Sequence, residues 1–139
     1  MLNAVLTTLC QELNLGPPPE KTKKGVYPLV ISPTLQIDIR PLDPGCGFDA
    51  VLNELPADVP EREDLLIYLM RANFLCQGTG ESAIALDLDE KFLTLSSVLP
   101  YDSDYREFKG FLEDFANYVD FWRREIAEWV QKHISNKDN

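Results

Sequence analysis

The sequence has little of what catalytic and metal sites are built from. It contains one histidine, His133, and three cysteines, Cys10, Cys46 and Cys76, which form no CxxC pair. Zinc sites need clustered ligands, and a nucleophilic side chain normally depends on a neighbouring base, most often histidine. An odd number of separated cysteines also argues against a disulfide framework and favours a reducing compartment. We therefore expect no metal, no cofactor and no enzyme activity.

Basic residues are also scarce. Thirteen lysines and arginines stand against 23 aspartates and glutamates, which gives a formal net charge of -10. This charge repels nucleic acid phosphates and anionic membranes, and it suits a partner that is basic, apolar or both. The first residues carry no basic segment of the kind that opens a signal peptide, and no apolar run is long enough to cross a bilayer. We expect a cytoplasmic protein that binds no nucleic acid and inserts into no membrane.

Two short stretches have some features of ligand-binding motifs. The sequence Gly78-Thr79-Gly80 lacks the GK[ST] of a phosphate-binding loop, and the acidic group Asp87, Asp89 and Glu90 lacks the twelve-residue calcium pattern. Both are predicted to be turns. A small-molecule enzyme with a pocket between sheet and long helix is a third-ranked alternative, because no nucleophile–base pair supports it.

Hydrophobic periodicity predicts an α+β fold in the order α-β-β-β-α-β-β-α, with an antiparallel sheet packed with helices. The alternation is clearest at 34–40, and Pro28 places the first strand at a sheet edge. Asp104 and Glu107 have capping-box spacing before the last helix. We expect one domain over residues 1–135 and a polar tail at 136–139. The predicted helices are 2–14, 60–75 and a long one after Asp104, and the predicted strands are 26–31, 34–40, 48–55, 81–88 and 91–99.

The helix at 60–75 has more apolar surface than one core contact requires. At about 100° per residue, Leu65, Leu69 and Ala72 share one side. Leu66, Met70 and Phe74 share another. A small domain has one core, so the second face needs a second partner. A two-fold dimer would cover it with its own copy.

The chain resembles the class I type III secretion chaperones of the Tir-chaperone type. The resemblance is densest from about residue 65 to 124, and it rests on the order of short motifs together with size, acidity and element pattern. The matching residues are Leu69, Ala72-Asn73, Leu75, Gly78-Thr79-Gly80, Ala85-Leu86-Asp87, Leu93-Thr94-Leu95, Leu99-Pro100, Tyr105, Phe108, Leu112-Glu113-Asp114-Phe115 and Trp122.

The resemblance implies a dimer in the cytoplasm of a bacterium that injects effector proteins. Such chaperones hold the N-terminal segment of an effector in extended form and present it to the secretion ATPase, without nucleotide or metal. The partner in the dimer is the chain itself or a related chaperone. The implied dimer residues are Leu66, Met70, Phe74, Ala83 and Ala85. The implied effector-binding residues are Leu2, Leu6, Leu9, Leu35 and Ile37, and packing in the core is the alternative interpretation of each.

A second hypothesis is a regulatory adaptor, in which the same dimer binds a transcription protein or a regulator of secretion. Both roles can use one surface. The identity of the bound partner separates them.

Overall fold

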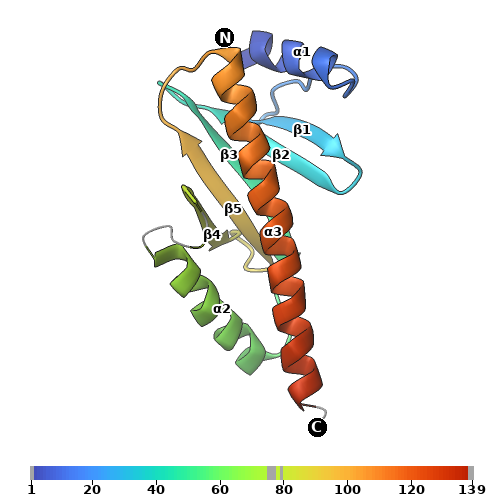
Figure 1. Cartoon of the computed structure of the whole chain (residues 1–139), viewed down its shortest axis with the longest axis vertical. Coiled ribbons are helices and arrows are strands. Elements are labelled where there is room, and N and C mark those ends of the chain that lie inside the picture. Colours follow the sequence, from blue (N-terminus) through green and yellow to red (C-terminus); the bar gives the residue numbers. More distant parts are fainter. Residues whose placement is uncertain (1, 75–77, 79, 138–139) are drawn as a thin grey trace. The chain divides into compact units, whose positions relative to one another are not determined.

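The computed structural model describes residues 2–74, 78 and 80–137, and their side chains as far as His133. Its elements follow the predicted order of helix, three strands, helix, two strands and helix (Figure 1). They are α1 (Leu2–Glu12), β1 (Tyr27–Ser32), β2 (Leu35–Pro41), β3 (Cys46–Glu54), α2 (Val59–Asn73), β4 (Ser82–Leu86), β5 (Phe92–Leu99) and α3 (Tyr105–Lys137).

The helix boundaries follow local chain chemistry. The Asp58 side chain accepts a hydrogen bond from the Glu61 backbone N–H at 3.2 Å, so α2 begins at Val59, one residue before the predicted start. Asp104 caps α3 in the same way, with the Glu107 N–H at 2.8 Å, which confirms the predicted cap. Helix α1 ends at Glu12, two residues earlier than predicted, because Asn14 takes a left-handed conformation with φ 54°. Helix α3 continues to Lys137, into the predicted tail.

The strands form one five-stranded sheet in the order β1-β2-β3-β5-β4. Strand β1 lies at an edge, as Pro28 predicts, and pairs antiparallel with β2, with Leu29 opposite Ile37. Strand β2 pairs antiparallel with β3, with Ile39 opposite Phe48. The antiparallel α+β fold predicted from the sequence is confirmed.

The chain divides into two compact units, residues 1–50 with 97–115 and residues 51–96 with 116–139. In the first unit the fully buried ring of Phe48 contacts Phe108, Phe111 and Phe115, with ring centroids 5.2–5.8 Å apart. The core of the second unit is made by buried apolar side chains. These are Leu52, Leu65, Leu69, Ile84, Leu93, Leu95, Val119, Trp122 and Ile126. The single domain over residues 1–135 stays a prediction.

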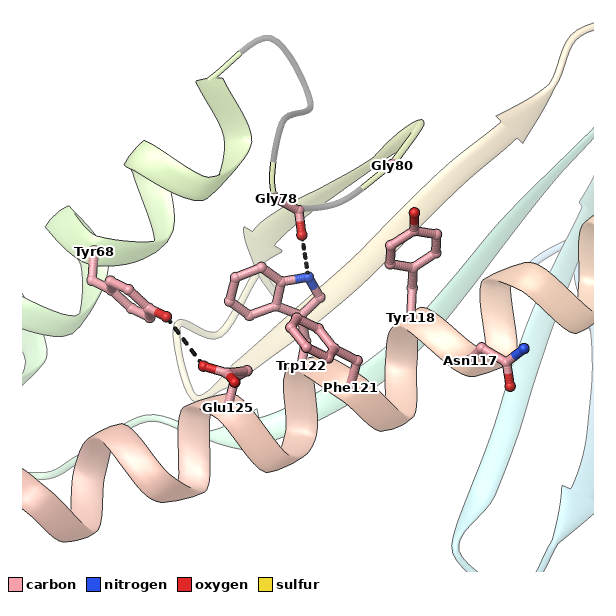
Figure 2. A pocket seen from close by; sticks show the side chains of 8 residues that line it. All are labelled: Tyr68, Gly78, Gly80, Asn117, Tyr118, Phe121, Trp122 and Glu125. Atoms are coloured by element: carbon pink, nitrogen blue, oxygen red, sulfur yellow. Dashed lines mark hydrogen bonds between the residues drawn. The ribbon is translucent and has the colours of Figure 1, made fainter.

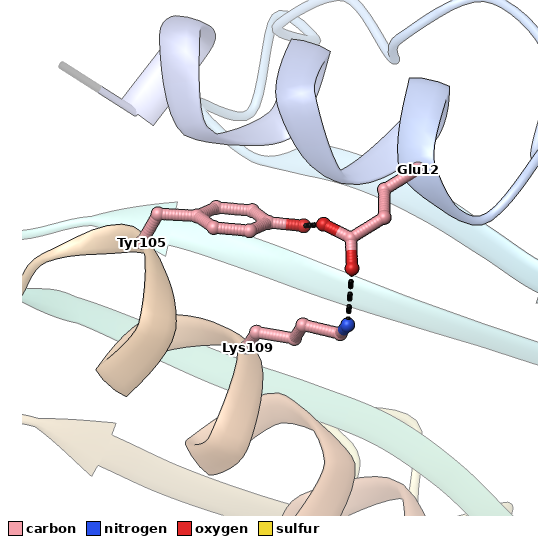
Figure 3. Close-up of polar contacts among 3 residues, drawn as sticks. All are labelled: Glu12, Tyr105 and Lys109. Carbon is pink, nitrogen blue, oxygen red and sulfur yellow. Dashed lines mark hydrogen bonds and ion pairs between the residues drawn. The ribbon is translucent and has the colours of Figure 1, made fainter.

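A polar cluster in the first unit ties α1 to the start of α3 (Figure 3). The Tyr105 hydroxyl donates to one carboxylate oxygen of Glu12, and the Lys109 ammonium donates to the other, each at 2.5 Å. The hydrogen bond from Lys109, followed by that from Tyr105, lowers the pKa of Glu12. The same contact raises the pKa of Tyr105 to about 12.

This cluster predicts a pH dependence of folding. A carboxyl group with a lowered pKa stabilises the fold above its ordinary pKa, about 4.3, and loses that contribution as the pH falls through the lowered value. Glu12→Gln should therefore lower the urea midpoint at pH 7, and the difference from the parent chain should shrink below about pH 4. Glu128→Gln, at an exposed position of α3, is the control. A difference that stays constant down to pH 3 would contradict the assignment.

Candidate functional site

The exposed apolar surface of the second unit includes the residues predicted for the dimer. Leu65 and Leu69 are buried, whereas Met70 is 71% exposed on another face of α2, and Phe74, directly after the helix, is 64% exposed. Leu66 is half-buried. Ala83 and Ala85 are exposed on β4. Helix α2 therefore has one buried and one exposed apolar face, and its self-association stays a prediction.

The Asn73 side chain joins α2 to β4. Its amide N–H donates to the carbonyl oxygen of Ile84 at 2.7 Å, and its oxygen accepts from the Ile84 N–H at 2.8 Å. The side chain thus satisfies both backbone groups of one residue of edge strand β4 and hinders pairing of another strand there. It also holds the exposed face of α2 beside Ala83 and Ala85.

Part of this surface was not predicted from the sequence. Ile67 is 51% exposed, and Leu88 is completely exposed. The apolar residues on nearly all sides of the 60–75 helix were a signal for Ile67. The predicted strand at 81–88 is too long, because β4 ends at Leu86 and Asp87 begins a turn. Its carboxylate accepts from the backbone N–H groups of Lys91 and Phe92, as the turn interpretation predicts.

The residues predicted for effector binding divide into two groups. Leu6, Leu9 and Ile37 are at most 1% exposed, so in this conformation they are core residues, which was the alternative interpretation. Leu2 and Leu35 are half-buried and reach the surface. Only these two of the predicted set are available to a partner without rearrangement.

Leu2 borders a cavity of about 240 Å³ in the first unit. Val5, Leu42 and Phe108 also line it, and Leu42 is 41% exposed. Cys46 lies in the wall, and burial, followed by the charge of Asp102, raises its thiol pKa to about 11. A thiol with so high a pKa stays protonated and unreactive at neutral pH. The cavity is suited to holding an apolar side chain.

The other candidate residues form no catalytic or metal-binding group in the part of the chain that the structure describes. His133 stacks on Trp129 with ring centroids 3.6 Å apart, and it is half-buried. Gly78 and Gly80 lie in turns, while Leu75, Cys76 and Thr79 lie outside the described residues. Among the described residues, no three His, Cys, Asp or Glu side chains are grouped for a metal. No helix in that part of the chain has the length and apolarity to span a membrane.

Comparison with known proteins gives one family match. The family described as "Tir chaperone protein (CesT) family" matches residues 4–123. No curated protein matches in sequence. The fold is similar to that in the structure of the HopA1–SchA chaperone–effector complex, with a TM-score of 0.63, 14% identity, and coverage of 88% of this chain and 93% of that one.

Two further structures share the fold. One is the ExoU–SpcU complex from the type III secretion system of Pseudomonas aeruginosa, with a TM-score of 0.59, 14% identity, and 93% and 97% of the two chains covered. The other is YbjN, a putative transcription regulator from E. coli, with a TM-score of 0.64, 13% identity, and 90% of each chain covered. At these identities the likeness establishes the fold.

Proposed function

The chain belongs to the Tir chaperone protein (CesT) family, and on this premise we propose that it is a type III secretion chaperone. It binds the N-terminal segment of one or more effector proteins, keeps that segment soluble and extended, and delivers it to the secretion ATPase. It works as a dimer in the bacterial cytoplasm. The family match over residues 4–123 is the observation that carries the proposal.

We place the cargo surface in the first unit. An apolar side chain of the effector segment enters the cavity beside Leu2, and a neighbouring stretch contacts the half-buried Leu35 on β2. Strand β1, at the sheet edge with Val30 54% exposed, offers main-chain pairing to an extended segment. In this mode of binding, the main-chain hydrogen bonds between strand and segment give affinity, and the pockets for side chains give specificity.

The proposed mechanism is thermodynamic. An effector segment that becomes ordered on binding loses chain entropy, and many small apolar contacts offset that loss. The formal charge of -10 attracts basic effector segments and keeps the loaded complex soluble. No step uses a nucleotide or a metal.

A native pull-down from the producing cell with mass spectrometry tests the proposal. We expect a secreted protein, bound through its N-terminal region. Recovery of a transcription protein without any secreted substrate would replace the chaperone role with the regulatory adaptor.

The adaptor is the second candidate because one fold relative, YbjN, is described as a putative transcription regulator. The same dimer would then bind a transcription protein or a regulator of secretion. The test that separates the two roles is whether the partner found in the complex is also found in the secreted fraction.

A further inference from the structure

The second unit contains a cavity of about 550 Å³, and four of the eight residues that line it are aromatic (Figure 2). Tyr68 comes from α2, and Tyr118, Phe121, Trp122 and Glu125 come from α3. The volume falls within the usual range of ligand pockets, roughly 300–1,000 Å³. None of the functions considered above uses this cavity.

The aromatic walls are held in place. The Trp122 indole N–H donates to the Gly78 carbonyl oxygen at 2.9 Å, and its ring meets Phe121 edge to face, with centroids 5.4 Å apart. A Cβ on Gly80 would lie 2.6 Å from the Tyr118 ring, so that ring lies directly against the glycine. The side chains of this cavity would therefore lose little conformational entropy when a ligand binds.

Two of the rings have free surface. Phe121 is 44% and Tyr118 36% exposed, although the same helix carries the buried side chains of Val119, Trp122 and Ile126. An aromatic face carries partial negative charge and attracts cations positioned over it. Glu125 adds a full negative charge to the same cavity, one turn of α3 beyond Phe121.

Glu125 has no cationic partner among the side chains that the structure describes. Its one hydrogen bond there is a long one from the Tyr68 hydroxyl, at 3.4 Å, and burial followed by the Glu125 charge raises the pKa of Tyr68. A carboxylate has room for several donors, so sites remain for a ligand. A neutral apolar ligand would cover this charge without compensating it, and an anion would be repelled.

We propose that this cavity binds the guanidinium group of an arginine side chain carried by a partner polypeptide. A planar guanidinium stacks on aromatic rings and donates in parallel to a carboxylate, which an ammonium group does less well. The ring of Phe121 supplies the stacking surface, and Glu125, one turn further along α3, supplies the carboxylate. The net charge of -10 draws a basic segment toward the chain.

The test uses two short peptides, N-acetyl-Gly-Arg-Gly-amide and its citrulline counterpart, which has nearly the same shape without the charge. Binding is followed by the NMR signal of the Trp122 indole N–H, which Trp129→Phe identifies by removing the other indole signal. We expect a saturable millimolar shift with the arginine peptide and at least about fivefold weaker binding of the citrulline peptide.

Three variants complete the test. Glu125→Gln keeps an oxygen for the Tyr68 hydroxyl but removes the charge, and Phe121→Leu removes an exposed ring. Each should weaken arginine binding about fivefold, while Glu128→Gln, one turn further along α3, should not change it. The amide spectrum of each variant verifies the fold. Equal binding of the two peptides, the absence of a saturable shift, or unchanged affinity in both pocket variants would overturn the proposal.

Discussion

Gly45→Ala is expected to lower the free energy of unfolding by roughly 3 kcal/mol or more, which is a large part of the stability of a small protein. Gly45 has φ +88°, where a side chain costs about 1 kcal/mol. A Cβ there would lie 1.9 Å from the Leu99 carbonyl oxygen and 2.9 Å from the Tyr101 nitrogen. Both neighbours are backbone atoms, so the turn between β2 and β3 has to move.

That movement would also break the hydrogen bond from the Gly45 N–H to the Asp102 carboxylate, now 3.1 Å long. Gly25→Ala is the matched control, because Gly25 has φ +81° and open space around it. We expect Gly25→Ala to lose only about 1 kcal/mol. Urea unfolding followed by circular dichroism measures both variants. Equal losses in the two would show that the close approach of the backbone at Gly45 is unimportant.

Met70→Glu is expected to convert the proposed dimer to a monomer while the fold remains intact. Met70 is 71% exposed in the single chain, so a glutamate there costs the monomer little. In a two-fold interface each chain would bury the new carboxylate, and an unpaired buried charge costs several kcal/mol. The dissociation constant should rise at least about a hundredfold, which corresponds to roughly 2.8 kcal/mol.

Val59→Glu is the matched control for this prediction. Val59 is 55% exposed on the same helix, outside the predicted interface, and a glutamate in the first turn suits the helix dipole. Light scattering at micromolar concentration should give a monomer mass for Met70→Glu and a dimer mass for Val59→Glu. If Met70→Glu is still a dimer, the interface lies elsewhere. If the parent chain is a monomer, the proposed dimer is wrong.

The element order was predictable because each element has a strong local pattern. The alternation at 34–40 became β2, with Ile37 and Ile39 buried, and Pro28 marked an edge strand. The capping chemistry of Asp104 fixed the start of α3. These signals lie within a few residues of the positions they determine, so a single sequence contains them.

Whether an individual apolar side chain is buried or exposed was less predictable. Leu2, Leu6 and Leu9 share one stripe of α1, yet Leu6 and Leu9 are buried and Leu2 is half-exposed. Periodicity identifies which face of a helix turns inward. The elements that pack on that face determine which of its residues become fully buried. The same limit applies to Leu35 and Ile37 of β2.

The aromatic cavity could have been found in part. Tyr118, Trp122 and Glu125 have the spacing i, i+4 and i+7, which places them on one face of α3. Trp122 also belongs to the apolar stripe of this helix, and such a stripe is typical of packing in a core. The contribution of Tyr68 depends on the packing of α2 in the second unit, which no local pattern reveals.

The most direct test of the account is the solubility of the partner's N-terminal segment, produced with and without this chain. We predict that the segment is insoluble alone and soluble in a stoichiometric complex, and that Leu2→Glu, at the cavity in the first unit, lowers the soluble fraction. Equal solubility of the segment in the absence and presence of the chain would contradict the chaperone function.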